Sequence, residues 1–63
     1  MKIDMLCGSK FVTELDVGKG AIPRKGEFIF YYDVEYVVEK VNWKFDCKTD
    51  CLESVSISVC VVE

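Results

Sequence analysis

The chain has 63 residues, which allows a single domain, residues 1–63, with a small hydrophobic core. Hydrophobic residues make up 51% of the chain, which argues against a disordered segment, and no apolar run reaches the roughly 20 residues that span a bilayer. The formal net charge of −3 argues against a nucleic-acid-binding protein, because such proteins neutralise phosphates with Lys and Arg.

The beginning of the chain predicts a β-hairpin made of residues 2–7 and 10–17. The turn signal is Gly8 followed by Ser9, and apolar side chains recur at odd positions on both sides of it. We expect this odd face, with Ile3, Met5 and Phe11, to point into the core. The start of the sequence shows no long apolar leader, so we expect a cytoplasmic protein with reduced thiols.

Residues 18–26 predict a wide loop, because they contain three of the four glycines and the only proline. Proline has a fixed φ and no N–H, so Pro23 is expected before a strand and not inside a central one.

Residues 27–45 hold seven of the eight aromatic residues and predict two long strands folded back on each other. A three-residue turn, residues 33–35, is favoured because it gathers the most aromatic area on one face. With that turn, the inward residues of the first strand are Phe28, Phe30 and Tyr32. Ile29 and Tyr31 then point outward.

The second strand of this pair changes parity near Glu39 and Lys40. Apolar positions are even before this point (Tyr36 and Val38) and odd after it. One extra residue in the ladder, a β-bulge, would let both sets face the core, and a strand break is the alternative. The odd residues expected in the core are Val41, Trp43 and Phe45.

The last predicted strand, residues 54–62, alternates valine or isoleucine with serine or cysteine. Together the segments indicate an all-β fold: a five-stranded antiparallel meander that forms a small Src-homology-3-like barrel or a strongly twisted sheet. An open sheet that needs a partner over one face is the alternative.

The residue types argue against an enzyme. The chain has no histidine, so it lacks the base of a Ser-His or Cys-His pair, and its glycines match no phosphate-binding motif. We therefore expect no catalytic residues and no cofactor. Zinc binding, a disulfide and ordinary free thiols are all open for the four cysteines, although the paired spacing of a zinc knuckle is absent and no metal site is predicted. They are Cys7, Cys47, Cys51 and Cys60.

Two candidate binding surfaces follow from these patterns. A strand that is apolar on both faces leaves an exposed patch, which typically marks an interaction site. The residues expected to bind a protein partner are Ile29, Tyr31, Val37, Arg24 and Lys25. The alternative is a nucleic-acid-binding barrel that uses the basic loop 19–25 and one stacking ring. Its residues are Lys19, Arg24, Lys25 and Tyr31.

Residues 22–43 also resemble small proteins that are common in phages and mobile elements. The shared pattern is a Pro-x-x-Gly-Glu turn at Pro23, followed by a Tyr-x-Val segment from Tyr36 and a Val-x-Trp segment from Val41. This chain differs by its four cysteines and by the absence of glycine in the turn after Tyr32. The resemblance implies a sheet topology, a phage origin, and an inhibitor of a host enzyme or defence system.

The expected function is therefore a non-enzymatic protein-binding module, of the phage inhibitor kind, that occludes a surface of a larger protein. A homodimer or a partner complex is also expected, through strand addition along the outward Ser and Cys row of the last strand.

Overall fold

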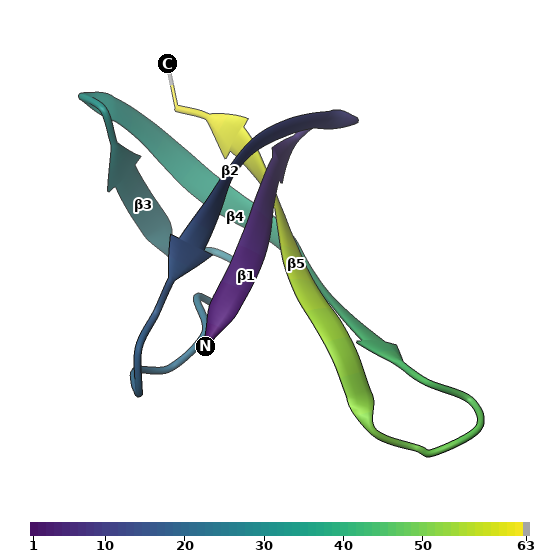
Figure 1. The fold of residues 1–63 in the computed structure, drawn as a ribbon. Helices are drawn as coiled ribbons and strands as arrows, with labels where there is room; N and C mark the ends of the chain where they lie inside the picture. Colours follow the sequence, from purple (N-terminus) through teal and green to yellow (C-terminus); the bar gives the residue numbers. More distant parts are fainter. Residues whose placement is uncertain (63) are drawn as a thin grey trace.

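The computed structural model describes residues 1–62, which fold into a single sheet of five strands without a helix (Figure 1). This confirms the all-β class and the number of strands. The strands are β1 (Lys2–Cys7), β2 (Lys10–Asp16), β3 (Phe28–Tyr31), β4 (Val34–Phe45) and β5 (Leu52–Val61).

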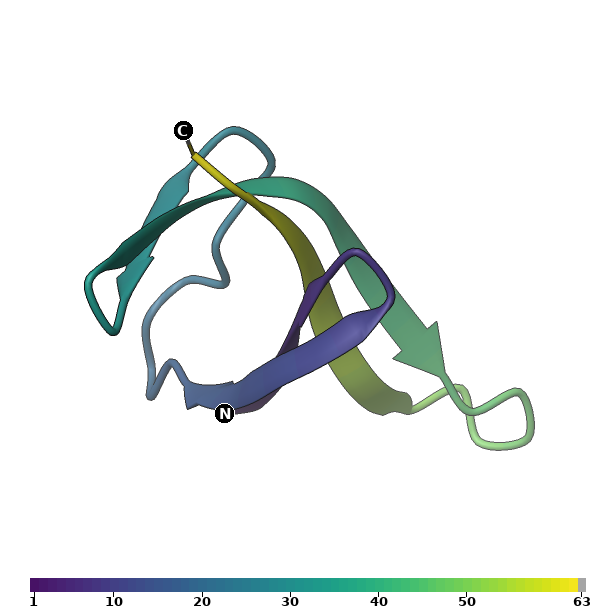
Figure 2. The ribbon, with the colours of Figure 1, turned by 90° about the horizontal axis from the view of Figure 1, so that it is seen from above.

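The strand order is β2-β1-β5-β4-β3, so the sheet is mixed and differs from a meander at one connection. β2 and β3 do not pair; β1 pairs with β5 in parallel, and every other pair is antiparallel. The sheet curls into a half-barrel, and residues 17–27 run across its open side from one edge strand to the other (Figure 2). The parallel pair forms because it places Met5 beside Ile57, which buries both side chains completely.

The core lies on the inner face of the three central strands. Alternation in β5 sends its apolar residues inward and leaves Ser56 and Ser58 on the outer face. Loop residues Val17 and Ile22 pack against this core from the open side. The fully buried residues are Ile3, Met5, Val38, Val55, Ile57 and Val59.

A bulge in β2 changes which of its side chains reach the core. Met5 pairs with Thr13 and Leu6 pairs with Phe11, so Val12 is the extra residue. Val12 packs against the core, whereas Phe11 is 56% exposed. The expectation that Phe11 points inward is wrong, because the bulge reverses the alternation between Thr13 and Phe11.

The predicted bulge at Glu39 is confirmed. Val38 pairs with Val59 and Lys40 pairs with Ser58, so Glu39 is left over and both Val38 and Val41 reach the core. The same strand leaves Trp43 and Phe45 exposed, at 53% and 58%, which corrects their assignment to the core. The reason is that β1 covers β5 only along Ser56–Val59, so the far part of the β4–β5 hairpin extends alone.

The turn between β3 and β4 contains two residues, Tyr32 and Asp33, and not residues 33–35. Tyr31 pairs with Val34, and both turn residues have positive φ, 49° and 60°. This geometry matches the two-residue hairpin turns that twist with the strands. The shorter turn reverses the expected faces of β3.

The loop before β3 is fixed to β4 by backbone hydrogen bonds. Gly26 N–H donates to the Val38 carbonyl over 2.8 Å, and Val38 N–H donates to the Glu27 carbonyl over 2.9 Å. Gly26 has a φ of 93°, which a residue with a side chain rarely adopts. The carboxylate of Glu27 accepts a hydrogen bond from the Arg24 N–H, which links the two ends of the turn before β3.

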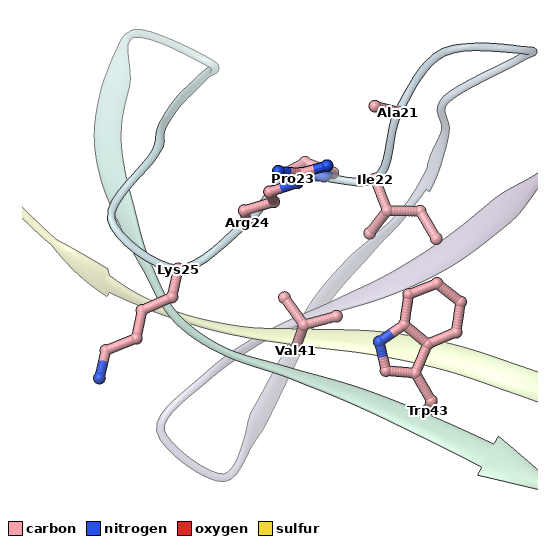
Figure 3. Close-up of a pocket in the computed structure, with 7 residues that line it drawn as sticks. All are labelled: Ala21, Ile22, Pro23, Arg24, Lys25, Val41 and Trp43. Carbon is pink, nitrogen blue, oxygen red and sulfur yellow. The ribbon is translucent and has the colours of Figure 1, made fainter.

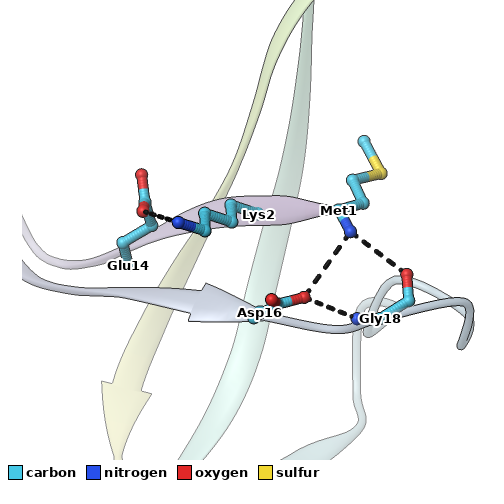
Figure 4. A network of polar contacts seen from close by, with 5 residues as sticks. All are labelled: Met1, Lys2, Glu14, Asp16 and Gly18. Carbon is cyan, nitrogen blue, oxygen red and sulfur yellow. Dashed lines mark hydrogen bonds and ion pairs between the residues drawn. The ribbon is translucent and has the colours of Figure 1, made fainter.

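The end of β2 is held to the beginning of β1 by a small polar network (Figure 4). The carboxylate of Asp16 accepts a hydrogen bond from Gly18 N–H over 2.8 Å and lies 3.5 Å from the Met1 amino group. Lys2 and Glu14 form an exposed ion pair at 3.9 Å. The Gly18 hydrogen bond, and then the Met1 charge, hold the pKa of Asp16 below its ordinary value.

Candidate interaction surfaces

The outer face of β3 presents two large aromatic side chains to solvent. Phe28 is 64% exposed and Phe30 is 69% exposed. Phe28 is paired with Val37, and residues directly opposite each other in a ladder point to the same side. We call the surface made by Phe28, Phe30 and Val37 the β3 aromatic face.

The neighbours of the β3 aromatic face extend it across the sheet. Val37 is paired with Cys60 of β5, which is exposed. Phe30 is paired with Glu35, whose carboxylate provides a charged margin. At the turn, Tyr32 is 83% exposed, the largest exposed fraction among the large hydrophobic residues. The surface therefore has an apolar centre and a polar border.

The sequence-predicted residues of β3 lie on the opposite side. Ile29 and Tyr31 are half-buried and pack against the core, so their expected outward orientation is wrong. The cause is the two-residue turn, which moves the β4 partner of each β3 residue by three positions, for example from Val38 to Glu35 opposite Phe30. This is an odd number and therefore exchanges the faces. Among the predicted partner-binding residues of the strands, Val37 alone lies on the β3 aromatic face, where it is half-buried.

A second surface, the Trp43 groove, lies on the inner side of the sheet (Figure 3). Residues 21–25 of the loop and Val41 and Trp43 of β4 line it, and its volume is about 360 Å³. Val41 is paired with Ile57 and Trp43 with Val55, both of which are buried, so these side chains share the core face. The groove therefore lies between the loop and the core face of β4.

The charges of the groove are positive. Arg24 and Lys25 line it, and neither takes part in any of the ion pairs found within residues 1–62. Within residues 1–62, no carboxylate lines the groove. Arg24 and Lys25 are exposed and free to bind an anionic group.

The four residues of the predicted nucleic-acid site are only partly together. Arg24 and Lys25 share the groove, while Lys19 is exposed elsewhere in the loop and does not line it. Tyr31 is half-buried, and its ring contacts Tyr32 edge to face at a centroid distance of 4.7 Å. The aromatic residue that lines the groove together with these two cations is Trp43, which the sequence interpretation had assigned to the core.

The cysteines are free and dispersed. Cys47 and Cys51 lie exposed in the β4–β5 turn, while Cys7 packs against the core on the inner face and Cys60 is exposed on the outer face. β1 and β5 are neighbours, but opposite faces keep Cys7 and Cys60 apart. Within residues 1–62, no three Cys, Asp or Glu side chains gather in a group that could hold a metal ion.

Two further features concern partners and membranes. The last strand pairs with β1 and β4 along Ser56–Val59, so its central part offers no free edge and the expected strand addition there is wrong. Free edges belong to β2, to β3 and to the far part of the β4–β5 hairpin, where, among residues 1–62, residues 41–45 of β4 pair only with β5 and residues 52–55 of β5 pair only with β4. In the part of the chain that the structure describes, no helix is long and apolar enough to cross a membrane.

Comparison of the chain with protein-family models, curated proteins and solved structures finds no match. The two surfaces described above are therefore the basis for the functional proposals.

Proposed function

We propose that the protein is a non-enzymatic binding module that docks the β3 aromatic face onto a larger protein and occludes a surface there. The observation that carries this proposal is the exposure of Phe28 and Phe30, 64% and 69%, side by side on one face of an edge strand. Neighbouring exposed aromatic rings bury a large area on binding and lose little conformational entropy.

The chemistry of the face supports a protein partner. An apolar centre with a charged margin is the usual arrangement of protein interfaces, in which a few aromatic anchors carry most of the binding energy. Phe28 and Phe30 would be the anchors, with Val37 opposite Phe28 on β4 and Glu35 at the margin. These side chains contribute little to the core, so their exposure is not explained by folding.

The mode of action is occlusion, which needs no catalytic group. The similarity of residues 22–43 to small phage proteins supports an inhibitor of a host enzyme or defence system as the biological role. Inhibition by binding requires only that the β3 aromatic face covers a functional surface of the partner.

The test is capture from a lysate of the cells in which the protein is found. Wild-type protein is compared with Phe28→Thr/Phe30→Thr, in which threonine keeps the strand propensity and removes both rings. The matched control is Phe45→Thr, which removes a ring that is 58% exposed at the far end of the β4–β5 hairpin. We expect the wild type and the control to retain one protein in equimolar amount, and the double variant to lose it.

Equal capture by the double variant, shown by circular dichroism to be folded, would contradict the proposal. Sedimentation of the purified protein tests whether the partner is instead a second copy of this chain. If a wild-type dimer dissociates in Phe28→Thr/Phe30→Thr and persists in Phe45→Thr, a second copy of this chain occupies the β3 aromatic face.

Nucleic-acid binding through the basic loop has less support. Its predicted ring, Tyr31, is half-buried, and only Arg24 and Lys25 of its three cations lie together. Trp43 could replace Tyr31 as a stacking ring, so an oligonucleotide is included in the experiment on the groove below.

A further inference from the structure

The Trp43 groove is independent of the β3 aromatic face. Along β4, Val37 points to the outer side, while Val41, after the bulge at Glu39, points to the inner side. The two surfaces therefore lie on opposite sides of one sheet and can be altered separately. We propose that the Trp43 groove is a docking site for an acidic, apolar peptide segment of a protein partner.

The apolar part of the ligand follows from the walls of the groove. Ile22 and Pro23 of the loop face Val41 and Trp43 of β4 across the opening (Figure 3). Trp43 remains 53% exposed, so its ring offers an uncovered apolar surface inside a concave site. The volume of about 360 Å³ is at the lower end of ligand sites and suits a few side chains of an extended segment.

The acidic part of the ligand follows from charge complementarity. The chain as a whole carries a net charge of −3, yet both charged residues in this groove, Arg24 and Lys25, are positive. Of the eight Lys and Arg residues, Lys2 pairs with Glu14 and Lys44 with Glu53, and the other six, Arg24 and Lys25 among them, form no ion pair within residues 1–62. A carboxylate on the ligand would give Arg24 or Lys25 the partner that each lacks within residues 1–62.

Hydrogen bonds fix the backbone of the segment that carries these cations before binding. Arg24 donates its N–H to Glu27 and accepts the Glu27 N–H on its carbonyl over 3.0 Å, and Gly26 is bonded to Val38. The backbone that carries Arg24 and Lys25 is thus fastened to β4, the strand that carries Trp43. A preorganised site loses less conformational entropy when a flexible peptide binds.

A peptide fits the groove better than a single-stranded nucleic acid. Five of its seven lining residues are apolar, and the groove contains one exposed ring and two cations. Nucleic-acid channels instead follow the phosphates with a row of positive charges and offer successive rings for stacking.

The experiment selects short random peptides against the immobilised protein and then measures each in solution. Trp43 is the only tryptophan, so its emission reports occupation of the groove directly. We expect the selected peptides to be enriched in Asp and Glu next to apolar residues and to change the Trp43 emission. A thymidine oligonucleotide is titrated in parallel as the nucleic-acid probe.

Charge-reversed variants provide the matched comparison. Arg24→Glu/Lys25→Glu should weaken peptide binding about tenfold or more, because two favourable charge contacts become repulsive. Lys10→Glu/Lys48→Glu changes the total charge equally at exposed residues outside the groove and should leave binding unchanged. Calorimetry adds Trp43→Ala, which should abolish binding, against Phe45→Ala, which should not.

Three results would overturn the proposal. These are selected peptides without acidic enrichment, equal loss of binding in the two charge-reversed variants, and tighter binding of the oligonucleotide than of any selected peptide. The Phe28→Thr/Phe30→Thr variant should bind the selected peptides normally, so failure at the groove and failure at the β3 aromatic face are distinguishable.

Discussion

β5 and β3 are both rich in apolar residues, yet they differ in which of these residues are buried. In β5, Val55, Ile57 and Val59 are at most 2% exposed, and the serines between them face outward. In β3, Phe28 and Phe30 face the solvent while Ile29 and Tyr31 pack against the core. When one face of a strand is polar, the sequence shows that the other face points into the core. When both faces are apolar, as in β3, the sequence does not show which face points inward.

Under the proposed function, the same difference separates residues that stabilise the fold from residues that bind a partner. β5 lies in the middle of the sheet and supplies three of the six fully buried residues. β3 lies at an edge, contains four residues and exposes its two phenylalanines. Changes in β5 should therefore affect folding, and changes on the outer face of β3 should affect binding. The predictions below test this division.

The largest effect is expected in the centre of β5. Ile57 is completely buried, so Ile57→Ala should lower the free energy of unfolding by about 2–5 kcal/mol through lost burial and a cavity. Ser58→Ala, one residue away on the outer face, should change it by about 0.5 kcal/mol or less. Urea unfolding of both variants measures the contrast, and similar losses would show that β5 has no distinct inner face.

A smaller and opposite effect is expected at the turn after β3. Tyr32 and Asp33 have positive φ, which Asn and Gly adopt more readily. Tyr32→Asn/Asp33→Gly should therefore raise the free energy of unfolding by about 1 kcal/mol. Thermal unfolding measures this change, with Val34→Gly as the destabilising control because Val34 belongs to the β4 ladder. Destabilisation by the double variant would argue for a different turn.

The smallest effect concerns Asp16 at the edge of the sheet. Its pKa is lowered by the Gly18 hydrogen bond and by the Met1 amino group, so the folded state holds the carboxylate more strongly than the unfolded state. The resulting stabilisation is present above the ordinary Asp pKa and is lost as the pH falls through the lower, folded value. Asp16→Asn should remove the part of the stability loss at acidic pH that comes from Asp16. Unfolding curves across the acidic range measure this change, and a stability–pH profile identical to that of the wild type would contradict the prediction.

Much of the fold could be predicted from alternation and turn residues. The hairpin around Gly8, the bulge at Glu39 and the inward row of β5 are all visible because apolar and polar residues separate cleanly there. The parallel pairing of β1 with β5 could not be predicted, since it depends on which strands meet after the loop crosses the sheet. The alternation pattern of a strand shows which face is buried, but it does not show which strand pairs with it.

The candidate site was predicted in part. Val37, Arg24 and Lys25 of the two proposed surfaces were named from the sequence, but Phe28 and Phe30, the proposed anchors, were placed on the wrong face. The turn that decides the face contains Tyr32 and Asp33, which lack the glycine that normally marks a two-residue turn. Trp43 was missed because it shares the parity of the core, and only the structure shows that nothing covers it fully.

The assignment of the two faces of β3 is the central claim, and one pair of unfolding measurements tests it. Phe28→Thr/Phe30→Thr is compared with Ile29→Thr/Tyr31→Thr, so that the residue introduced and the strand are the same. We predict a loss of about 1 kcal/mol or less for the outer pair and about 2–3 kcal/mol for the inner pair. The reverse order would show that the phenylalanines form the core and would remove the proposed binding face.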